Sequence, residues 1–120
     1  MTDLTAVEGR IWSLLDRYRA ELEPATIYGM PSLRWPGAKA HDSFAAVRPG
    51  KRYVSLYLLA ADTHPGALEG SPDALIRRRT GKAAFTFPEL DDEMTNDLAA
   101  LLDRLYGRYR ADHLGSAAGR

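Results

Sequence analysis

The chain has 120 residues, of which 45% are hydrophobic, and this size and composition suit one globular domain with its own core. The absence of cysteine excludes disulfide bonds, iron–sulfur ligation and thiol catalysis, and equal counts of 16 basic and 16 acidic residues exclude the basic excess of a general nucleic-acid binder. Because the start, Met1-Thr2-Asp3-Leu4, does not read as a signal peptide and no apolar run is long enough to span a bilayer, we expect a soluble, cytoplasmic protein with no membrane partner.

Apolar residues three and four positions apart predict an amphipathic first helix. Its expected buried face carries Leu4, Val7, Ile11, Leu14, Leu15, Tyr18 and Leu22. Thr5 and Glu8 have the spacing of a capping box at the start of this helix. Pro24 should end it, because proline disfavours a helical conformation at Glu23 and supplies no backbone donor.

The middle of the chain predicts three strands. The first covers residues 26–35 and is interrupted by Pro31, which favours an edge strand, a bulge or a bend. Residues 43–48 and 53–59 follow, and the turn signal Pro49-Gly50-Lys51 between them predicts an antiparallel hairpin. Alternation in the third strand should point one set of side chains toward the helices and the other away from them. The first set is Val54, Leu56 and Leu58, and the second is Tyr53, Ser55 and Tyr57.

The second half of the chain predicts a loop over residues 62–70, a short helix, a strand over residues 83–87 and a long helix. Ser71 and Pro72 suit the start of the short helix, which should run through Arg79 and close at Gly81. The long helix should bury Met94, Leu98, Leu101, Leu102, Leu105 and Tyr109, with Asp91, Asp92 and Glu93 at its start and Arg104, Arg108 and Arg110 toward its end.

This order of elements predicts an α+β two-layer sandwich, with an antiparallel sheet covered on one face by the N- and C-terminal helices. We expect residues 1–114 to form this single domain. Residues 115–120 have little to bury, so we expect them to form a flexible C-terminal tail.

Four blocks of the sequence are distinctive: Tyr28-Gly29-Met30-Pro31, Phe44-Ala45-Ala46, Val54-Ser55-Leu56-Tyr57, and Gly81-Lys82 before Phe85-Thr86-Phe87-Pro88. In their order and spacing these blocks resemble the YdhG-like family, a domain of unknown function. The resemblance extends over nearly the whole chain and implies a frataxin-like fold. One branch of the family is described as an intracellular iron chaperone, so the resemblance implies iron as a cofactor. The first helix, however, carries only Glu8, Asp16, Glu21 and Glu23 among its arginines, and this is not a dense acidic ridge.

The first candidate ligand site lies in and after the first predicted strand. Its residues are Tyr28, Met30, Arg34 and Trp35, with Lys82 as a further candidate. Aromatic walls and a cation would suit a small anionic molecule. The alternative is that Gly29 and Pro31 only shape a bend and that the aromatic side chains pack in the core.

A basic cluster is the second candidate site, for an anion or a phosphate backbone. It consists of Arg77, Arg78, Arg79 and Lys82, and Arg48, Lys51 and Arg52 would join it if the fold brought them together. The amide of Gly81 could add a donor to such a site. The alternative is an exposed helix end whose cations complement the helix dipole.

Two further groups of residues are less specific candidates, one for a cation site and one for a general base. The acidic residues Glu89, Asp91, Asp92, Glu93 and Asp97 could hold a hard cation, or could simply favour the start of a helix. The histidines His41, His64 and His113 share no metal-binding spacing. His41 beside Asp42 could act as an oriented general base, but the sequence has no nucleophile motif to pair with it.

We therefore expect a non-catalytic module that binds a small ligand or a protein, with a homodimer through the sheet face or edge as one form of the latter. The alternatives are iron binding by analogy with one family branch, and contact with an anion or nucleic acid through the basic cluster. Zero net charge disfavours nucleic acid, and no motif favours an enzyme.

Overall fold

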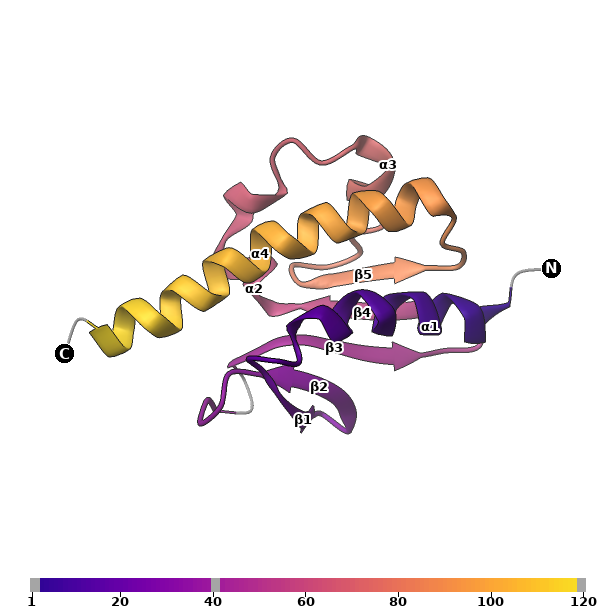
Figure 1. Ribbon diagram of the computed structural model, residues 1–120. Helices are drawn as coiled ribbons and strands as arrows, with labels where there is room; N and C mark the ends of the chain where they lie inside the picture. Colours follow the sequence, from indigo (N-terminus) through magenta and orange to yellow (C-terminus); the bar gives the residue numbers. More distant parts are fainter. Residues whose placement is uncertain (1–2, 40–41, 119–120) are drawn as a thin grey trace.

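The computed structural model describes residues 3–39 and 42–118, the last four of them by their backbone. Within these residues, five strands form one antiparallel sheet in the order β1-β2-β3-β4-β5 (Figure 1). The strands are β1 (Glu23–Ile27), β2 (Met30–Arg34), β3 (Ser43–Pro49), β4 (Val54–Leu58) and β5 (Ala84–Phe87). The helices are α1 (Leu4–Leu15), η1 (Asp16–Tyr18), α2 (Leu59–Thr63), η3 (Pro65–Leu68), α3 (Asp73–Ile76) and α4 (Asp92–Ala118). The predicted α+β two-layer sandwich is confirmed.

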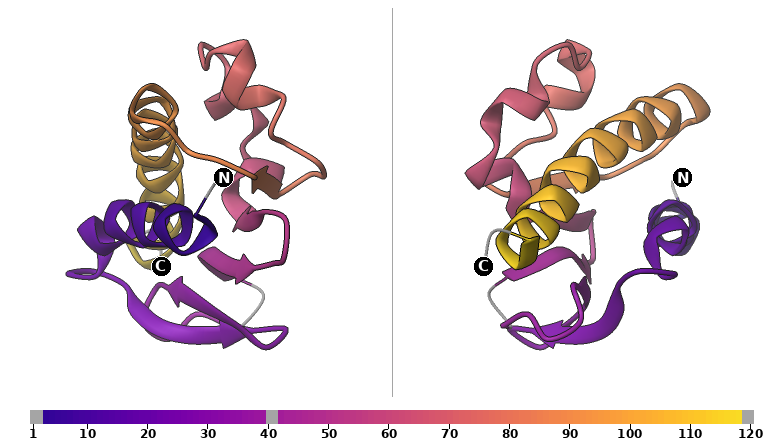
Figure 2. Two further views of the ribbon diagram at one scale, coloured as in Figure 1. Left: turned by 90° about the vertical axis from the view of Figure 1, so that its right-hand side faces the viewer. Right: turned by 60° about the vertical axis from the view of Figure 1, so that its left-hand side comes forward.

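The helices α1 and α4 cover the same face of the sheet, and the segment from α2 to α3 lies on the other side of α4 from α1 (Figure 2). The core fills the space between these helices and the sheet. Its fully buried side chains include Ile11 and Leu15 of α1, Leu56 of β4, and Leu98 and Leu102 of α4. The apolar faces predicted for the two terminal helices therefore meet over the sheet, as their periodicity indicates.

The first helix differs from its prediction at both ends. Asp3, not Thr5, caps it, because the Asp3 carboxylate accepts a hydrogen bond from the Thr5 amide at 3.0 Å. The α-helix ends at Leu15, and the 3₁₀ turn η1 continues the buried face to Tyr18. Pro24 does not terminate a helix but lies inside β1, at an edge of the sheet where a missing backbone donor is tolerated.

The predicted first strand is two strands. Residues 23–34 form the β1–β2 hairpin, in which Ile27 pairs with Met30 across the two-residue turn Tyr28-Gly29. Both turn residues have positive φ, 51° at Tyr28 and 78° at Gly29, as in a type I′ turn. Pro31 pairs with β1 but lies outside the β2–β3 register, which starts at Ser32. The expectation that Pro31 is not a fully paired central residue is confirmed.

A β-bulge in β3 changes the direction of Phe44. The β2–β3 register moves from Leu33 opposite Ala45 to Arg34 opposite Ser43, which leaves Phe44 without a partner in β2. The ring of Phe44 is fully buried and contacts three tyrosines of the helical layer. The bulge thus gives the core a large side chain at a position where strict alternation would place it on the other face of the sheet.

The hairpin of β3 and β4 has the predicted strands, but the next segment contains more helix than expected. Leu59, predicted as the end of a strand, begins α2, and η3 lies inside the predicted loop. Helix α3 covers only Asp73–Ile76. Ser71 does not cap it, since the Ser71 hydroxyl accepts from the Arg104 guanidinium at 2.6 Å.

The long helix begins as predicted and extends further than expected. The Asp91 carboxylate accepts from the Met94 amide at 2.8 Å and so caps α4. The helix continues to Ala118, so residues 115–118 have helical backbone, and residues 119–120 lie outside the described part. The flexibility expected for residues 115–120 stays a prediction. Arg104 and Arg110 are consequently in mid-helix, where Arg104 binds the Ala67 carbonyl and Arg110 pairs with Glu21.

Candidate functional site

The outer face, as we call the side of the sheet that faces away from α1 and α4, carries small, hydroxyl and aromatic side chains. It includes Ile27, Met30, Ser32, Ala46, Arg48, Ser55, Tyr57 and Thr86, which the register places beside one another across the strands. Ala46 lies opposite Tyr57, and Arg48 opposite Ser55. On the inner face, Val54, Leu56 and Leu58 are fully buried, as alternation predicts.

An apolar hollow of about 510 Å³ lies on the outer face at the end formed by the β1–β2 turn. It is lined by Ile27, Tyr28, Gly29, Met30, Ala46, Arg48, Tyr57 and Leu59. Ile27 and Ala46 are buried here without belonging to the main core cluster. The outer face therefore has a small apolar floor of its own, and its volume is in the range of small-molecule sites.

A second hollow of about 440 Å³ adjoins the first and shares Arg48 and Tyr57 with it. Its other lining residues are Pro49, Gly50, Lys51, Arg52, Tyr53 and Ser55. Gly50 permits the tight turn that carries the cations, because a Cβ there would lie 2.8 Å from the Tyr53 carbonyl oxygen. Of the described residues that line either hollow, none is acidic, so the two hollows together favour an anion.

Tyr28 has an unfavourable backbone conformation for its residue type. Its φ of 51° is in the left-handed region, which Asn, Asp and Gly adopt at much lower cost than an aromatic residue. Its side chain is nevertheless 78% exposed, so burial in the core does not compensate for the strain. Strain of this kind gathers at functional sites, and Tyr28 lies at the rim of the apolar hollow.

The substitution Tyr28→Asn should raise the free energy of unfolding by about 1 kcal/mol, because Asn-Gly is the preferred sequence for this turn. Urea unfolding measures this effect. Tyr53→Asn, at an exposed tyrosine without positive φ, is the control and should give no gain. A lower free energy of unfolding in Tyr28→Asn would contradict the claim that Tyr28 strains the backbone at this turn.

The structure separates the first set of predicted ligand residues. Tyr28 and Met30 line the apolar hollow together. Arg34 instead pairs with Glu23 at 3.1 Å. Trp35 packs against the core, and its ring stacks on His113 with centroids 5.5 Å apart. Lys82 follows α3 on the way to β5 and does not line either hollow.

Two residues of the predicted basic cluster, Arg79 and Lys82, lie beside each other. The Arg79 guanidinium donates two hydrogen bonds to the Lys82 carbonyl, at 3.1 and 2.5 Å. The Leu58 amide bonds to the Ala83 carbonyl, so Lys82 lies at the Leu58 end of β4. Lys51 and Arg52 precede the opposite end of β4, about 13 Å away at the usual rise of a strand. Lys82 therefore lies away from Lys51 and Arg52, whereas the Arg78 carbonyl bonds to the amide of Thr86, the partner of Ser55 in the sheet.

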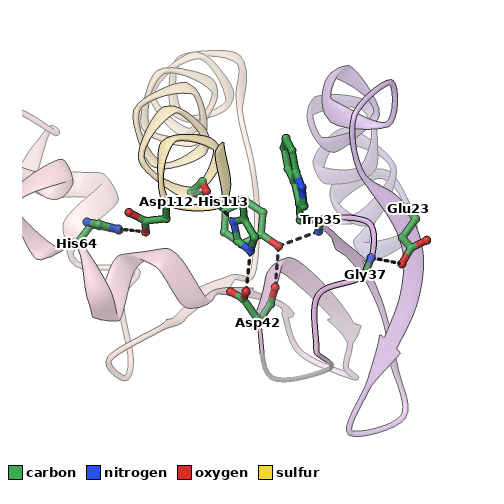
Figure 3. Close-up of polar contacts among 8 residues, drawn as sticks. Glu23, Trp35, Gly37, Asp42, His64, Asp112 and His113 are labelled. Atoms are coloured by element: carbon green, nitrogen blue, oxygen red, sulfur yellow. Dashed lines mark hydrogen bonds and ion pairs between the residues drawn. The ribbon is translucent and has the colours of Figure 1, made fainter. Parts of the chain in front are cut away.

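A polar cluster joins the C-terminal half of α4 to the segment after β2 (Figure 3). The Tyr109 hydroxyl accepts from the Trp35 amide at 2.8 Å and donates to the Asp42 carbonyl at 2.6 Å. His113 bonds to the Asp42 carboxylate at 2.6 Å and, through its other ring nitrogen, to the Tyr109 carbonyl at 2.8 Å. On another side of α4, His64 lies 2.5 Å from Asp112.

These contacts hold α4 against the segment that connects β2 to β3, so we interpret the cluster as structural. Asp42, which with His41 was a candidate for an oriented general base, is paired with His113, and His41 lies outside the described residues. Two of the acidic residues also have structural partners. Asp91 caps α4, and Asp92 pairs with Arg10 at 2.8 Å. In the part of the chain that the structure describes, no group of three or more His, Asp or Glu side chains is placed to hold a metal ion.

No protein-family model, curated protein or solved structure matches the chain. The resemblance to the YdhG-like family stays a prediction. Among the described helices, none is both long and apolar enough to cross a membrane.

Proposed function

We propose that this protein is a non-catalytic binding module and that the outer face takes a small ligand with a flat apolar body and a negative charge. The observation that carries the proposal is the apolar hollow with Arg48 on its wall and no acidic residue among its described lining. An aromatic or alicyclic ring would cover Ile27 and Ala46, and the guanidinium would pair with the anion.

The edges of the sheet are less suited to a partner than its outer face. Pro24 lies in the edge strand β1 and removes a backbone donor there. At the other edge, the Thr86 amide bonds to the Arg78 carbonyl and the Thr80 amide bonds to the Ala84 carbonyl, both at 2.8 Å. Residues 78–80 therefore cover part of β5. This arrangement disfavours a homodimer that extends the sheet through its edges.

The probe for this proposal is 1-naphthyl phosphate, which combines a flat ring system with an anion. We expect saturable binding in a fluorescence titration and weaker binding of neutral 1-naphthol. Arg48→Met should weaken binding of the phosphate about tenfold or more, because a hydrogen bond to a charged group is lost, and should leave naphthol binding unchanged.

Arg108→Met is the matched control, because Arg108 is an exposed arginine of α4 that lines neither hollow. Binding that is equally weakened in both variants would mean that only net charge matters. Binding that is unchanged in Arg48→Met would remove the outer face as the site.

A further inference from the structure

The two hollows form one continuous surface, because Arg48 and Tyr57 belong to both. The apolar hollow forms the first section of this surface and the basic hollow forms the second. Tyr28 lines the first section, Tyr53 lines the second, and Tyr57 lines both. Tyr28 is 78% exposed and Tyr53 is 46% exposed, while Tyr57 is partly buried between them. A small ligand of the proposed kind would fill only the first section, so the second section indicates a longer ligand.

We propose that the ligand of this surface is a short single strand of nucleic acid, an inference that rests on the proposed function. One base occupies the apolar hollow against Tyr28 and Tyr57. The adjoining phosphates lie in the basic hollow, within reach of Arg48, Lys51 and Arg52, and the next base packs on Tyr53.

The chemistry of both sections fits this occupant. Every base has a flat π face, and tyrosine rings are the usual stacking partners of unpaired bases. Each nucleotide link carries one negative charge, and the basic hollow offers three cations with no described acidic residue beside them. A peptide with aromatic and acidic side chains would need its own backbone donors and acceptors paired, and Pro24 removes a donor from β1, the edge strand beside the apolar hollow.

The geometry also favours a single strand over a duplex. Paired and stacked bases cannot turn their faces to a hollow in a sheet, whereas unpaired bases can. The apolar hollow has few polar side chains to read base edges, since its described lining is mostly apolar or aromatic. Binding should therefore depend little on base sequence. The zero net charge of the chain is compatible with such a site, because the cations that matter are local.

The experiment measures the anisotropy of a fluorescein-labelled uridine hexamer at low salt, with uridine monophosphate and a duplex of matched length as competitors. We expect the hexamer to bind more tightly than either competitor. Tyr57→Ala should weaken binding roughly 5- to 150-fold, the range for loss of one stacked base. Lys51→Ala should make the slope of log K against log salt shallower by about 0.7. Arg108→Ala should change neither quantity.

Thermal unfolding of each variant shows that a loss of binding does not come from a loss of fold. The inference would be overturned if the monophosphate or the duplex bound as tightly as the hexamer. It would also be overturned if the hexamer did not bind while 1-naphthyl phosphate did, and in that case the proposed function would stand. Absence of binding by both probes would overturn both.

Discussion

Replacing Phe44 with alanine is expected to lower the free energy of unfolding by about 3–5 kcal/mol, as for other fully buried aromatic residues. The bulge in β3 turns this ring into the helical layer. There its centroid lies 5.3 Å from that of Tyr18, 5.2 Å from that of Tyr106 and 5.5 Å from that of Tyr109. Alanine would remove these ring contacts and leave a cavity between β3 and α4.

Guanidinium unfolding of the wild type and Phe44→Ala measures this effect. Phe44→Leu is the matched control, because it keeps most of the volume, and it should lose less than half as much stability. A cost below about 1 kcal/mol for Phe44→Ala would show that the bulge does not place this ring in the core.

Stability should also fall steeply above pH 10, because tyrosines that stay neutral when buried in the folded chain ionise once it unfolds, and this favours the unfolded state. Burial raises the pKa of Tyr109 from 10.0 to about 12, against a lowering effect of the Trp35 amide. The folded-state pKa is above the unfolded value, so this stabilisation is complete below pH 10 and is lost as the pH rises to 12. Tyr109 alone should contribute a slope of about 1.4 kcal/mol per pH unit in this window.

The pKa values of two other tyrosines are also raised in the folded chain. Burial raises the pKa of Tyr18, and its hydrogen bond to Asp103 adds to the effect. Burial and the hydrogen bond to Glu21 likewise raise the pKa of Tyr106. These groups make the alkaline loss of stability steeper than Tyr109 alone would.

Urea unfolding at intervals between pH 8 and pH 12 tests this expectation, with Tyr109→Phe as the comparison. The variant should be about 1–3 kcal/mol less stable at neutral pH, because the Trp35 amide and the Asp42 carbonyl lose their partner. Its stability should nevertheless fall less steeply with pH. Equal slopes in the two proteins would show that Tyr109 does not contribute to the alkaline transition.

Periodicity and turn signals were sufficient to predict the layers of this fold. The spacing in α1 and α4, and the alternation in β4, have strong patterns because each element buries one face. The β1–β2 hairpin was missed because its turn is Tyr28-Gly29, and tyrosine is a poor indicator of positive φ. The bulge at Phe44 has no sequence signal of its own, since it depends on the register of β2 against β3.

The candidate site was predictable only in part, because most of it depends on how the strands pair. Tyr28 and Met30 were found because they are close in sequence to a turn. Arg48 and Tyr57 join them only through the register of three strands, which sequence spacing does not reveal. Trp35 was assigned to the ligand site because aromatic residues suit both a pocket and a core, and its contacts with α4 are decided by tertiary packing.

The claim that the outer face is the binding surface is tested most directly by mapping amide chemical shifts while 1-naphthyl phosphate is titrated into the labelled protein. The account predicts saturable shifts at Ala46, Arg48 and Tyr57, with the signals of Trp35 and His113 on the opposite layer unchanged. Saturable shifts confined to Trp35, His113 and the rest of α4, or no saturable shifts at all, would contradict it.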